Sequence, residues 1–278
     1  MSCRNSKYGK CAHCEENNTN EAWCLACDPD IATRWTSRNK NIDDCMKAFQ
    51  LRTFAYGYLI EWIPFNKLVD IIKIGEGGFG SIYKATWLDG IQKIEKVDAN
   101  NYIYKRSRES NSIVALKTLS GSKTCDPLSE FKNHMQCILF GSKLQIYGLT
   151  YNSETEEYFM VFQYADDGNI HRFLRSKFNN LTWELKLNQL KKISKDLSNI
   201  HEAGYVHADF HSGNILHNKG TSFVSDLGLS KKQNEKKAKD DFYENLAYVA
   251  PEIFFKEDYD QSLLQKLLKT ILNWLKNA

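Results

Sequence analysis

The sequence predicts an α+β fold, in which strands and helices occupy separate stretches of the chain. Short runs rich in β-branched residues gather between residues 66 and 120, bounded by glycines and polar turns. Helical periodicity follows later, most clearly over Leu181–Ala203, where Gly204 ends the pattern. Strands and helices segregated in this way are typical of the α+β class.

Four strands are expected from the apolar and β-branched runs. Three of them lie in the first half of the chain, at Leu68–Ile74, Ser81–Thr86 and Ser112–Thr118. The run Tyr158–Tyr164 is apolar along most of its length and predicts a buried strand. Between the second and third strands, Asp89–Asn111 is rich in Lys, Asn, Asp and Ser. This segment is expected to form an exposed hairpin extension or a mobile loop with solvated charges.

Four helices are expected as well. The aromatic stretch 46–64 predicts a linker helix that ends near Pro64, because a proline disfavours helical backbone in the residue before it. Glu130–Leu139 and Leu181–Ala203 belong to the main domain, and Ser262–Leu275 has the spacing of an amphipathic helix. The chain therefore divides into a cysteine-rich module (1–45), a linker helix (46–64), a main domain (65–255) and a C-terminal helix (256–278).

The composition is that of an ordinary globular protein, with 42% apolar and 26% charged residues in a chain of 278. The net charge of +3 is too small to indicate nucleic acid as the main partner. No run of about eighteen apolar residues predicts a membrane span, and the polar N-terminus does not resemble a secretory signal. We therefore expect a cytoplasmic protein, with the nucleus as an alternative, whose thiols are kept reduced.

Six of the eight cysteines lie in the first 45 residues. Cys11 and Cys14 form one C-x-x-C pair, and Cys24 and Cys27 form a second. Two such pairs can present four thiolates to one ion, which predicts a tetrahedral Zn²⁺ site. His13 could substitute for one sulfur. A disordered tail with incidental thiols is the alternative interpretation.

Seven short motifs occur in a fixed order between residues 75 and 252. They are Gly75-Glu-Gly-Gly-Phe-Gly80, Val114-Ala-Leu-Lys117, a carboxylate or histidine on the next helix, His207-Ala-Asp209, Asn214, Asp226-Leu-Gly228 and Ala250-Pro-Glu252. Phosphoryl transfer requires a glycine turn over the phosphates, a lysine for their oxygens, two metal ligands and a carboxylate that orients a hydroxyl. A lone glycine motif is weak, but the ordered set is specific.

With these motifs the chain resembles the eukaryotic protein kinase superfamily over about residues 65–255, and its catalytic loop resembles that of the tyrosine-kinase-like group. The resemblance implies a bilobal fold with a strand-rich N-lobe and a helical C-lobe. It also implies ATP and Mg²⁺ as cofactors and a protein serine or threonine as substrate.

The resemblance implies a set of nucleotide-binding residues. The glycine turn directly follows an apolar strand, and glycines let backbone N–H groups approach phosphate oxygens where a Cβ would collide. The remaining contacts would come from the next strand, the lysine strand and the hinge. The full set is Gly75, Gly77, Gly78, Gly80, Ile82, Ala115, Lys117, Gln163, Ala165, Asn214 and Asp226. An ordinary glycine hairpin is the alternative for the turn.

Four catalytic roles follow from the same resemblance. Lys117 would bind α- and β-phosphate oxygens, and Asp209 would accept or orient the proton of the substrate hydroxyl. Asp226 would chelate the Mg²⁺ that bridges the β- and γ-phosphates, and Asn214 would ligate a second Mg²⁺.

The chain departs from the family pattern at three places. His134 stands where the family has the helix glutamate that holds the lysine, and Glu130, one turn earlier, is the alternative partner. Ala208 replaces an arginine, which argues against activation by a phosphate on the following segment. Only 26 residues follow Glu252, so an incomplete helical C-lobe is expected.

These observations predict an ATP-dependent protein serine/threonine kinase that acts in intracellular signalling, without nucleic-acid or membrane partners. A nucleotide-binding pseudokinase, or a truncated regulator without phosphotransfer, is the alternative that His134 and the short C-terminal region favour. An interaction protein that works through its cysteine module is a further alternative.

Overall fold

The computed structural model describes residues 7–77, 80–98, 103–119, 126–177 and 181–232. The chain divides into two compact units, which are described separately. Unit 1 comprises Met1–Gly121 and Gln145–Gln163, and unit 2 comprises Ser122–Leu144 and Tyr164–Ala278. The predicted Ala250-Pro-Glu252 motif and the predicted helix Ser262–Leu275 lie outside the described residues.

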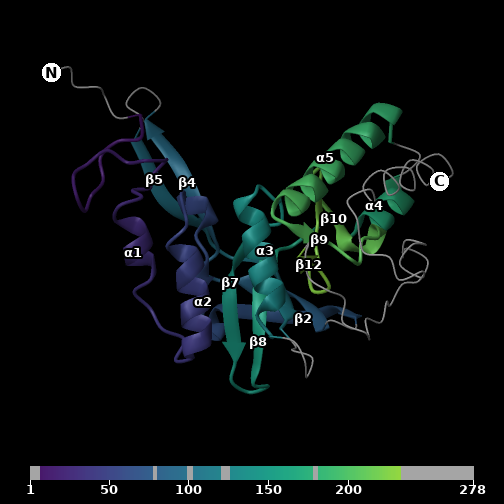
Figure 1. Ribbon diagram of the computed structural model, residues 1–278, viewed down its shortest axis with the longest axis horizontal. Helices are drawn as coiled ribbons and strands as arrows, with labels where there is room; N and C mark the ends of the chain where they lie inside the picture. The colour runs from purple at the N-terminus through teal and green to yellow at the C-terminus, as the bar shows by residue number, and fades with distance from the viewer. Residues whose placement is uncertain (1–6, 78–79, 99–102, 120–125, 178–180, 233–278) are drawn as a thin grey trace. The chain divides into compact units, whose positions relative to one another are not determined.

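Unit 1 is built on a six-stranded sheet with the strand order β1-β7-β8-β6-β3-β2 (Figure 1). Its strands are β1 (Glu61–Trp62), β2 (Leu68–Gly77), β3 (Gly80–Trp87), β6 (Ser112–Thr118), β7 (Ile146–Asn152) and β8 (Glu157–Gln163). Neighbouring strands are antiparallel, except that β1 runs parallel to β7. All four strands predicted from the sequence are therefore confirmed.

One face of this sheet forms the core of unit 1. Alternate residues of a strand point to the same face, so each of three neighbouring strands contributes a pair of buried side chains. The pairs are Ala85 and Trp87, Val114 and Leu116, and Phe159 and Val161. Residues between these positions point to the opposite face.

The predicted linker helix over 46–64 is wrong in its extent. The helix α2 spans Lys40–Gln50 instead, and the Asn39 side chain caps it by accepting hydrogen bonds from the next turn. It ends at Gln50, whose amide donates to the carbonyl of Ile60 at 2.8 Å. The rest of the stretch forms a 3₁₀ turn, η1 (Tyr56–Tyr58), and strand β1, because Glu61 and Trp62 pair with β7 in the sheet instead of continuing a helix.

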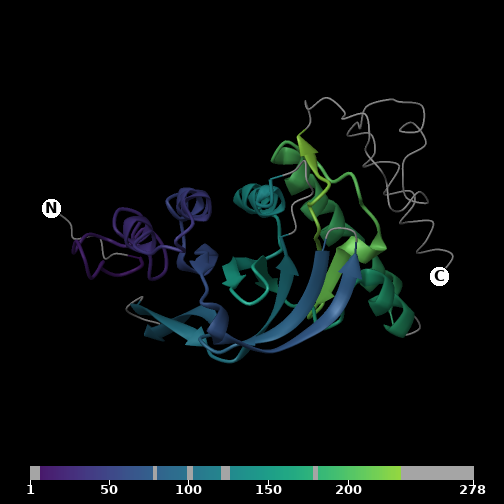
Figure 2. The ribbon, with the colours of Figure 1, turned by 90° about the horizontal axis from the view of Figure 1, so that it is seen from below.

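The cysteine-rich segment precedes α2 and contains one short helix, α1 (Asp28–Ala32). Figure 2 shows α1 and α2, in purple tones, on the same side of the unit 1 strands. Asn39 at the start of α2 donates from its side chain to the Tyr158 hydroxyl of β8 at 2.9 Å. The start of α2 is thus attached to the sheet through this bond.

The charged segment between β3 and β6 forms a separate two-stranded hairpin of β4 (Ile91–Asp98) and β5 (Ile103–Glu109). It lies beside α1 in Figure 1. Of the two predicted forms, the hairpin extension is the one that the structure adopts.

Unit 2 contains three α-helices among its described residues. They are α3 (Ser129–Leu139), α4 (Ile170–Lys177) and α5 (Trp183–Glu202), which confirms the two helices predicted for this part of the chain. Two short antiparallel pairs accompany them, β9 (Tyr205–Val206) with β12 (Lys231–Lys232), and β10 (Ile215–Asn218) with β11 (Thr221–Val224). Apolar side chains of α5 pack with Phe210, Val224 and Leu227 in one core.

Within the described part of the chain, none of the helices combines the length and the apolarity that crossing a membrane requires.

Candidate functional site

The glycine turn of unit 1 joins β2 to β3. Gly77 is paired with Gly80 across the two strands, and Gly75 is paired with Ile82. Gly80 has a φ of 120°, a backbone conformation that residues with side chains rarely adopt. A Cβ built on Gly75 would meet only the Cβ of Ile82, at 3.8 Å, so the packing of the chain itself does not require glycine there. Gly78 lies outside the described residues.

Three of the predicted nucleotide-binding residues share one face of the sheet. Ile82 on β3 lies directly across from Lys117 on β6, and Ala115 lies two residues before Lys117 on the same strand. This face is opposite to the buried core, since Val114 and Leu116 point to the other side. Lys117 is nevertheless only 4% exposed. Within unit 1 the structure therefore brings these three predicted residues together.

The residues predicted to form the hinge fall where the chain passes from one unit to the other. Gln163 is the last residue of β8, paired with Val114, and its N–H donates to the carbonyl of Gln145 at 2.9 Å. Ala165 belongs to unit 2, where it is buried and its carbonyl accepts a hydrogen bond from the Gly168 N–H at 3.0 Å.

In unit 2, a hairpin brings Asn214 and Asp226 to one place. The pairing of β10 with β11 sets Ile215 opposite Val224, so the residues just before and just after this pair lie at the same end of the hairpin. The Ser225 N–H and hydroxyl both donate to the carbonyl of Asn214, at 2.8 and 3.0 Å. Asn214 and Asp226 are twelve residues apart in the sequence, and the four residue pairs of this hairpin bring the two ends together.

Asp209 joins the same end of the hairpin through Asn214. The Asn214 side-chain amide donates to the carbonyl oxygen of Asp209 and to its carboxylate Oδ2, both at 3.0 Å. His211 Nε2 lies 3.5 Å from the same Oδ2. Three of the four predicted catalytic residues, Asp209, Asn214 and Asp226, are therefore gathered in unit 2. The fourth, Lys117, belongs to unit 1.

Both carboxylates of this group are presented from unusual backbone. Asp226 has a φ of 59°, and Ala208, directly before Asp209, has a φ of 61°. Left-handed backbone costs a residue with a Cβ about 1 kcal/mol or more. Such strain often occurs at functional sites, where the surrounding structure holds it in place.

His207 holds the loop that contains Asp209 to the segment before Asp226. Its Nε2 donates to the carbonyl of Ser225 at 2.8 Å, and its Nδ1 accepts from the Asp209 N–H at 3.3 Å. Only a neutral imidazole can make both bonds. Burial lowers the pKa of His207 below its ordinary value of 6.5, despite the opposing effects of the Ser225 carbonyl and the Asp226 and Asp209 carboxylates.

We expect the free energy of unfolding to fall as the pH drops below about 6.5, because the His207 side chain binds a proton in the unfolded state but stays neutral in the folded state. The contribution reaches about 1.4 kcal/mol per pH unit for one proton. Urea unfolding between about pH 7.5 and 5.5 should give a shallower pH dependence for His207→Asn than for the wild type. The exposed His171→Asn variant is the matched control. Equal slopes for His207→Asn and wild type would contradict this assignment.

His134 has a partner within unit 2. Its Nε2 accepts a hydrogen bond from the Leu227 N–H at 3.3 Å, and it is 2% exposed. The Asn133 side chain donates to the carbonyl of the same leucine at 3.2 Å. Glu130, the alternative partner considered for Lys117, lies close to Gly228, where a Cβ would come within 3.4 Å of its carboxylate. Helix α3 is thus bonded to the Asp226-Leu-Gly228 motif.

Asp196 is a buried carboxylate that positions the same region, and sequence reasoning missed it. It accepts from the Val224 N–H at 2.7 Å and from the Lys143 N–H at 2.8 Å. Burial raises its pKa, although these two N–H groups act in the opposite direction. The sequence feature that could have revealed Asp196 is its position on the apolar stripe of α5, between Ile193 and Ile200.

The four predicted metal ligands form the second candidate site. The sulfur atoms of Cys11, Cys14, Cys24 and Cys27 all lie within 4.8 Å of one another. Four sulfurs at about 2.3 Å from a tetrahedral Zn²⁺ are about 3.8 Å apart. The separation between the Cys14 and Cys24 sulfurs is 3.8 Å. The spacing therefore fits a zinc ion, whereas His13 is exposed and only its backbone N–H approaches a sulfur.

Backbone turns hold each pair of cysteines. Cys11 begins a small turn that is closed by its N–H to the Glu16 carbonyl at 2.8 Å. Cys24 begins a second turn, in which its carbonyl accepts from the N–H groups of Cys27 and Asp28, and this turn continues into α1. Burial raises the pKa of the Cys11 thiol, but the N–H groups of His13 and Cys14, together with the thiols of Cys24 and Cys14, outweigh it and lower the pKa to about 7.

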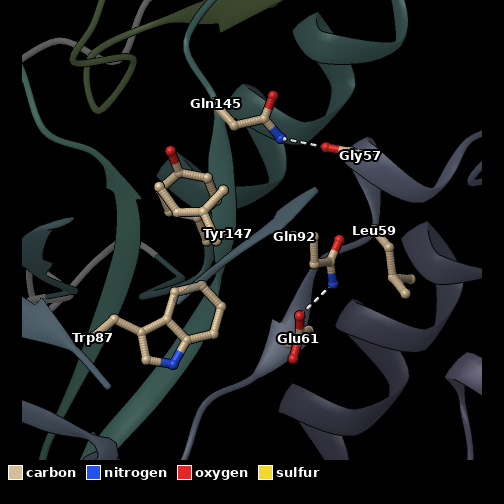
Figure 3. A pocket seen from close by; sticks show the side chains of 8 residues that line it. Gly57, Leu59, Glu61, Trp87, Gln92, Gln145 and Tyr147 are labelled. Atoms are coloured by element: carbon tan, nitrogen blue, oxygen red, sulfur yellow. Dashed lines mark hydrogen bonds between the residues drawn. The ribbon is translucent and has the colours of Figure 1, made fainter. Parts of the chain in front are cut away.

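A pocket of about 180 Å³ lies elsewhere in unit 1 (Figure 3). Its labelled lining includes Trp87, Tyr147, Glu61, Gln92 and Gln145. The polar groups already bond to the protein, since Gln145 donates to the Gly57 carbonyl at 3.1 Å and Gln92 donates to Glu61. These hydrogen bonds are made within the protein and do not indicate that the pocket binds a ligand.

Comparison with known proteins agrees with the motifs. A family model described as protein tyrosine and serine/threonine kinase matches residues 69–262, which is well over half of the chain. The matched range contains the glycine turn, Lys117 and the gathered residues of unit 2. The α+β kinase-like fold class expected from the sequence is thereby confirmed.

The curated relatives of this chain are protein kinases, and their sequence identity to it is low. A probable serine/threonine-protein kinase from Dictyostelium discoideum is 29% identical over 196 residues, covering 68% of this chain and 19% of the relative. A probable receptor-like serine/threonine-protein kinase from Arabidopsis thaliana is 29% identical over 168 residues, covering 57% and 33%. The serine/threonine-protein kinase hippo from Drosophila melanogaster is 24% identical over 243 residues, covering 84% and 32%. The chain thus spans about a third or less of each relative.

Proposed function

Because the chain belongs to the protein tyrosine and serine/threonine kinase family, we propose that it transfers the γ-phosphoryl group of ATP to a serine or threonine of a protein substrate. The observation that carries this proposal is the set of hydrogen bonds joining Asp209, Asn214 and the Asp226 segment in unit 2. The relatives from Dictyostelium discoideum, Arabidopsis thaliana and Drosophila melanogaster are named as serine/threonine-protein kinases, which favours serine and threonine over tyrosine.

Asp226 and Asn214 would hold the Mg²⁺ ions of the nucleotide. Both offer oxygen atoms, which Mg²⁺ prefers, and the hairpin of β10 and β11 fixes both on one end. When bound, Mg²⁺ neutralises the charge that develops on the phosphates. The left-handed backbone of Asp226 is consistent with a carboxylate held in place for such a role.

Asp209 would orient the hydroxyl that receives the phosphoryl group. Its Oδ2 already accepts from the Asn214 amide, which fixes the rotation of the carboxylate. Lys117 would bind phosphate oxygens, and the glycine turn around Gly75 would supply backbone N–H groups. The packing of the chain does not require glycine at position 75, and the open space there supports this assignment.

A pseudokinase is the second candidate, and His134 is the observation that favours it. Its ring nitrogen is engaged by the Leu227 N–H, and a neutral imidazole would hold a lysine ammonium less well than a carboxylate would. In that case the chain would bind nucleotide, or a partner, without phosphoryl transfer.

Mg·ATP-dependent incorporation of labelled phosphate separates these candidates. We expect incorporation into the chain itself or into a generic protein substrate by the wild type, and none by Asp226→Ala, because that variant lacks a metal ligand. Nucleotide-dependent thermal stabilisation without incorporation would instead support the pseudokinase. Incorporation that survives Asp226→Ala would contradict the proposed site.

We propose further that the four-cysteine cluster binds one Zn²⁺ ion with a structural role. The observation that supports this is the mutual closeness of the four sulfurs, because four protein ligands would fill a tetrahedral zinc shell and leave no open position for a substrate. A cytoplasmic location, with the nucleus as an alternative, belongs to the same proposal, since reduced thiols are needed for the metal. A role in intracellular signalling is proposed from the family alone.

A further inference from the structure

The hairpin of β4 and β5 lies outside the six-stranded sheet of unit 1. A two-stranded hairpin is marginally stable by itself in water, so it depends on contacts with other parts of the protein. Both of its ends continue into the nucleotide-side strands, since β3 precedes it and β6 follows it. What holds the hairpin therefore bears on the strands that carry Ile82 and Lys117.

Arg106 of β5 makes the most extensive contact of the hairpin with the cysteine-rich segment. Its Nε and Nη2 donate to the carbonyl of Ala22 at 2.8 and 2.6 Å. Its guanidinium lies over the rings of Trp23 and Tyr56, at 5.6 and 4.8 Å from their centroids. Trp23 is fully buried, so this contact reaches the interior of the cysteine-rich segment.

Asp28 connects Arg106 with the proposed metal site. Its Oδ2 accepts from Arg106 Nη2 at 2.6 Å and also from the backbone N–H of Cys24 at 2.6 Å. The carboxylate is buried, with the residue 4% exposed, and a buried charge requires a close partner. The Oδ2 atom of Asp28 thus connects Arg106 of the hairpin to Cys24, which would supply a sulfur ligand.

A second contact supports the same arrangement. The ring of Tyr104 on β5 packs against Tyr8, with centroids 6.1 Å apart. Tyr8 lies three residues before Cys11, so the contacts of Tyr8 and Asp28 connect the hairpin with both pairs of cysteines. The hairpin is therefore held in part by the turns that the metal would organise, and in part by Arg108, which donates to the Glu61 carboxylate of β1 at 2.6 Å.

We propose that the zinc site and the hairpin form one cooperative unit, with Asp28 and Arg106 as positioning residues between them. This rests on the proposed Zn²⁺ site but not on kinase activity. Metal binding fixes the turn from Cys24 to Asp28, and this turn holds Arg106. Loss of the metal releases Arg106 and loosens the hairpin, and by continuity the strands β3 and β6. The cysteine-rich segment thereby makes the nucleotide-side strands sensitive to zinc.

Hydrogen exchange on the full chain tests this directly. One equivalent of Zn²⁺ added to the metal-free wild type should slow exchange of the β4 and β5 amides by about tenfold or more, with a much smaller change in β7 and β8. Zinc affinity, measured by competition with a chelator, should fall by about tenfold in Arg106→Ala, as for other outer partners of metal ligands. Exchange in β7 and β8 of Arg106→Ala should match the wild type, which shows that the sheet is intact.

Two further variants keep the test decisive. Asp28→Asn retains an acceptor for the Cys24 N–H but lacks the charge that holds Arg106, and it should weaken zinc binding in the same direction. Lys105→Ala removes an exposed charge from the neighbouring position of β5, on the other face of the strand, and should leave zinc affinity within about twofold. A wild type that binds one equivalent of Zn²⁺ with unchanged hairpin exchange would overturn the coupling and leave the metal site standing. A chain that binds no zinc would overturn both.

Discussion

Replacing Asp209 with asparagine will slow phosphoryl transfer by about 10²–10⁴-fold and leave nucleotide binding nearly unchanged. Asparagine has the same shape, and its side-chain oxygen can still accept the hydrogen bond that Asn214 donates at 3.0 Å. The catalytic loop should therefore keep its conformation. What is lost is the negative charge that orients the substrate hydroxyl and attracts its proton.

The initial rate of phosphate incorporation measures this effect, and the thermal shift caused by Mg·ATP checks nucleotide binding. Asp166→Asn makes the same chemical change at an exposed position of unit 2 and should keep the wild-type rate. Asp209→Asn with a rate within a few-fold of wild type would remove Asp209 from the proposed mechanism.

Removing zinc will unfold the cysteine-rich segment. The segment from Tyr8 to Asp28 buries few apolar side chains, namely Cys11, Trp23 and Cys24. Such a small core cannot offset the conformational entropy of about twenty residues. Structural zinc supplies about 10–16 kcal/mol of apparent binding free energy in comparable small modules, and this free energy is available for folding only when the metal is bound.

Metal analysis and limited proteolysis test this expectation. The wild type should contain one equivalent of zinc, and Cys24→Ser should lose it and become cleavable by protease before Asp28. Cys45→Ser removes a buried thiol of α2 that is not a predicted ligand, and it should retain the zinc. A protected, folded segment in metal-free protein would contradict a structural role for the ion.

Local patterns in the sequence were sufficient for several elements. The β-branched run Ser112–Thr118 and the helical run ending at Gly204 formed as expected, because their periodicities match those of buried strands and half-buried helices. The linker helix is placed wrongly because the Asn39 side chain caps a helix that begins earlier, and because Glu61 and Trp62 pair with β7 in the sheet.

The contacts of single polar side chains were beyond the reach of sequence patterns. The segment around Arg106 was expected to carry only solvated charges, yet Arg106 reaches Asp28 from 78 residues away. His134 was considered only as a partner for Lys117, whereas the structure bonds it to the Leu227 N–H. Pairs so far apart in sequence share no periodicity that could reveal them.

Three features follow from the amino-acid sequence alone: the order of the motifs, the type of most elements and the identity of the four close cysteines. They depend on local spacing, which can be read along the chain. The partners of buried charges and N–H groups, as at Asp196 and Asp28, depend instead on the folded structure. A buried polar group must find a partner wherever the fold places one, so its partner is fixed by packing in three dimensions.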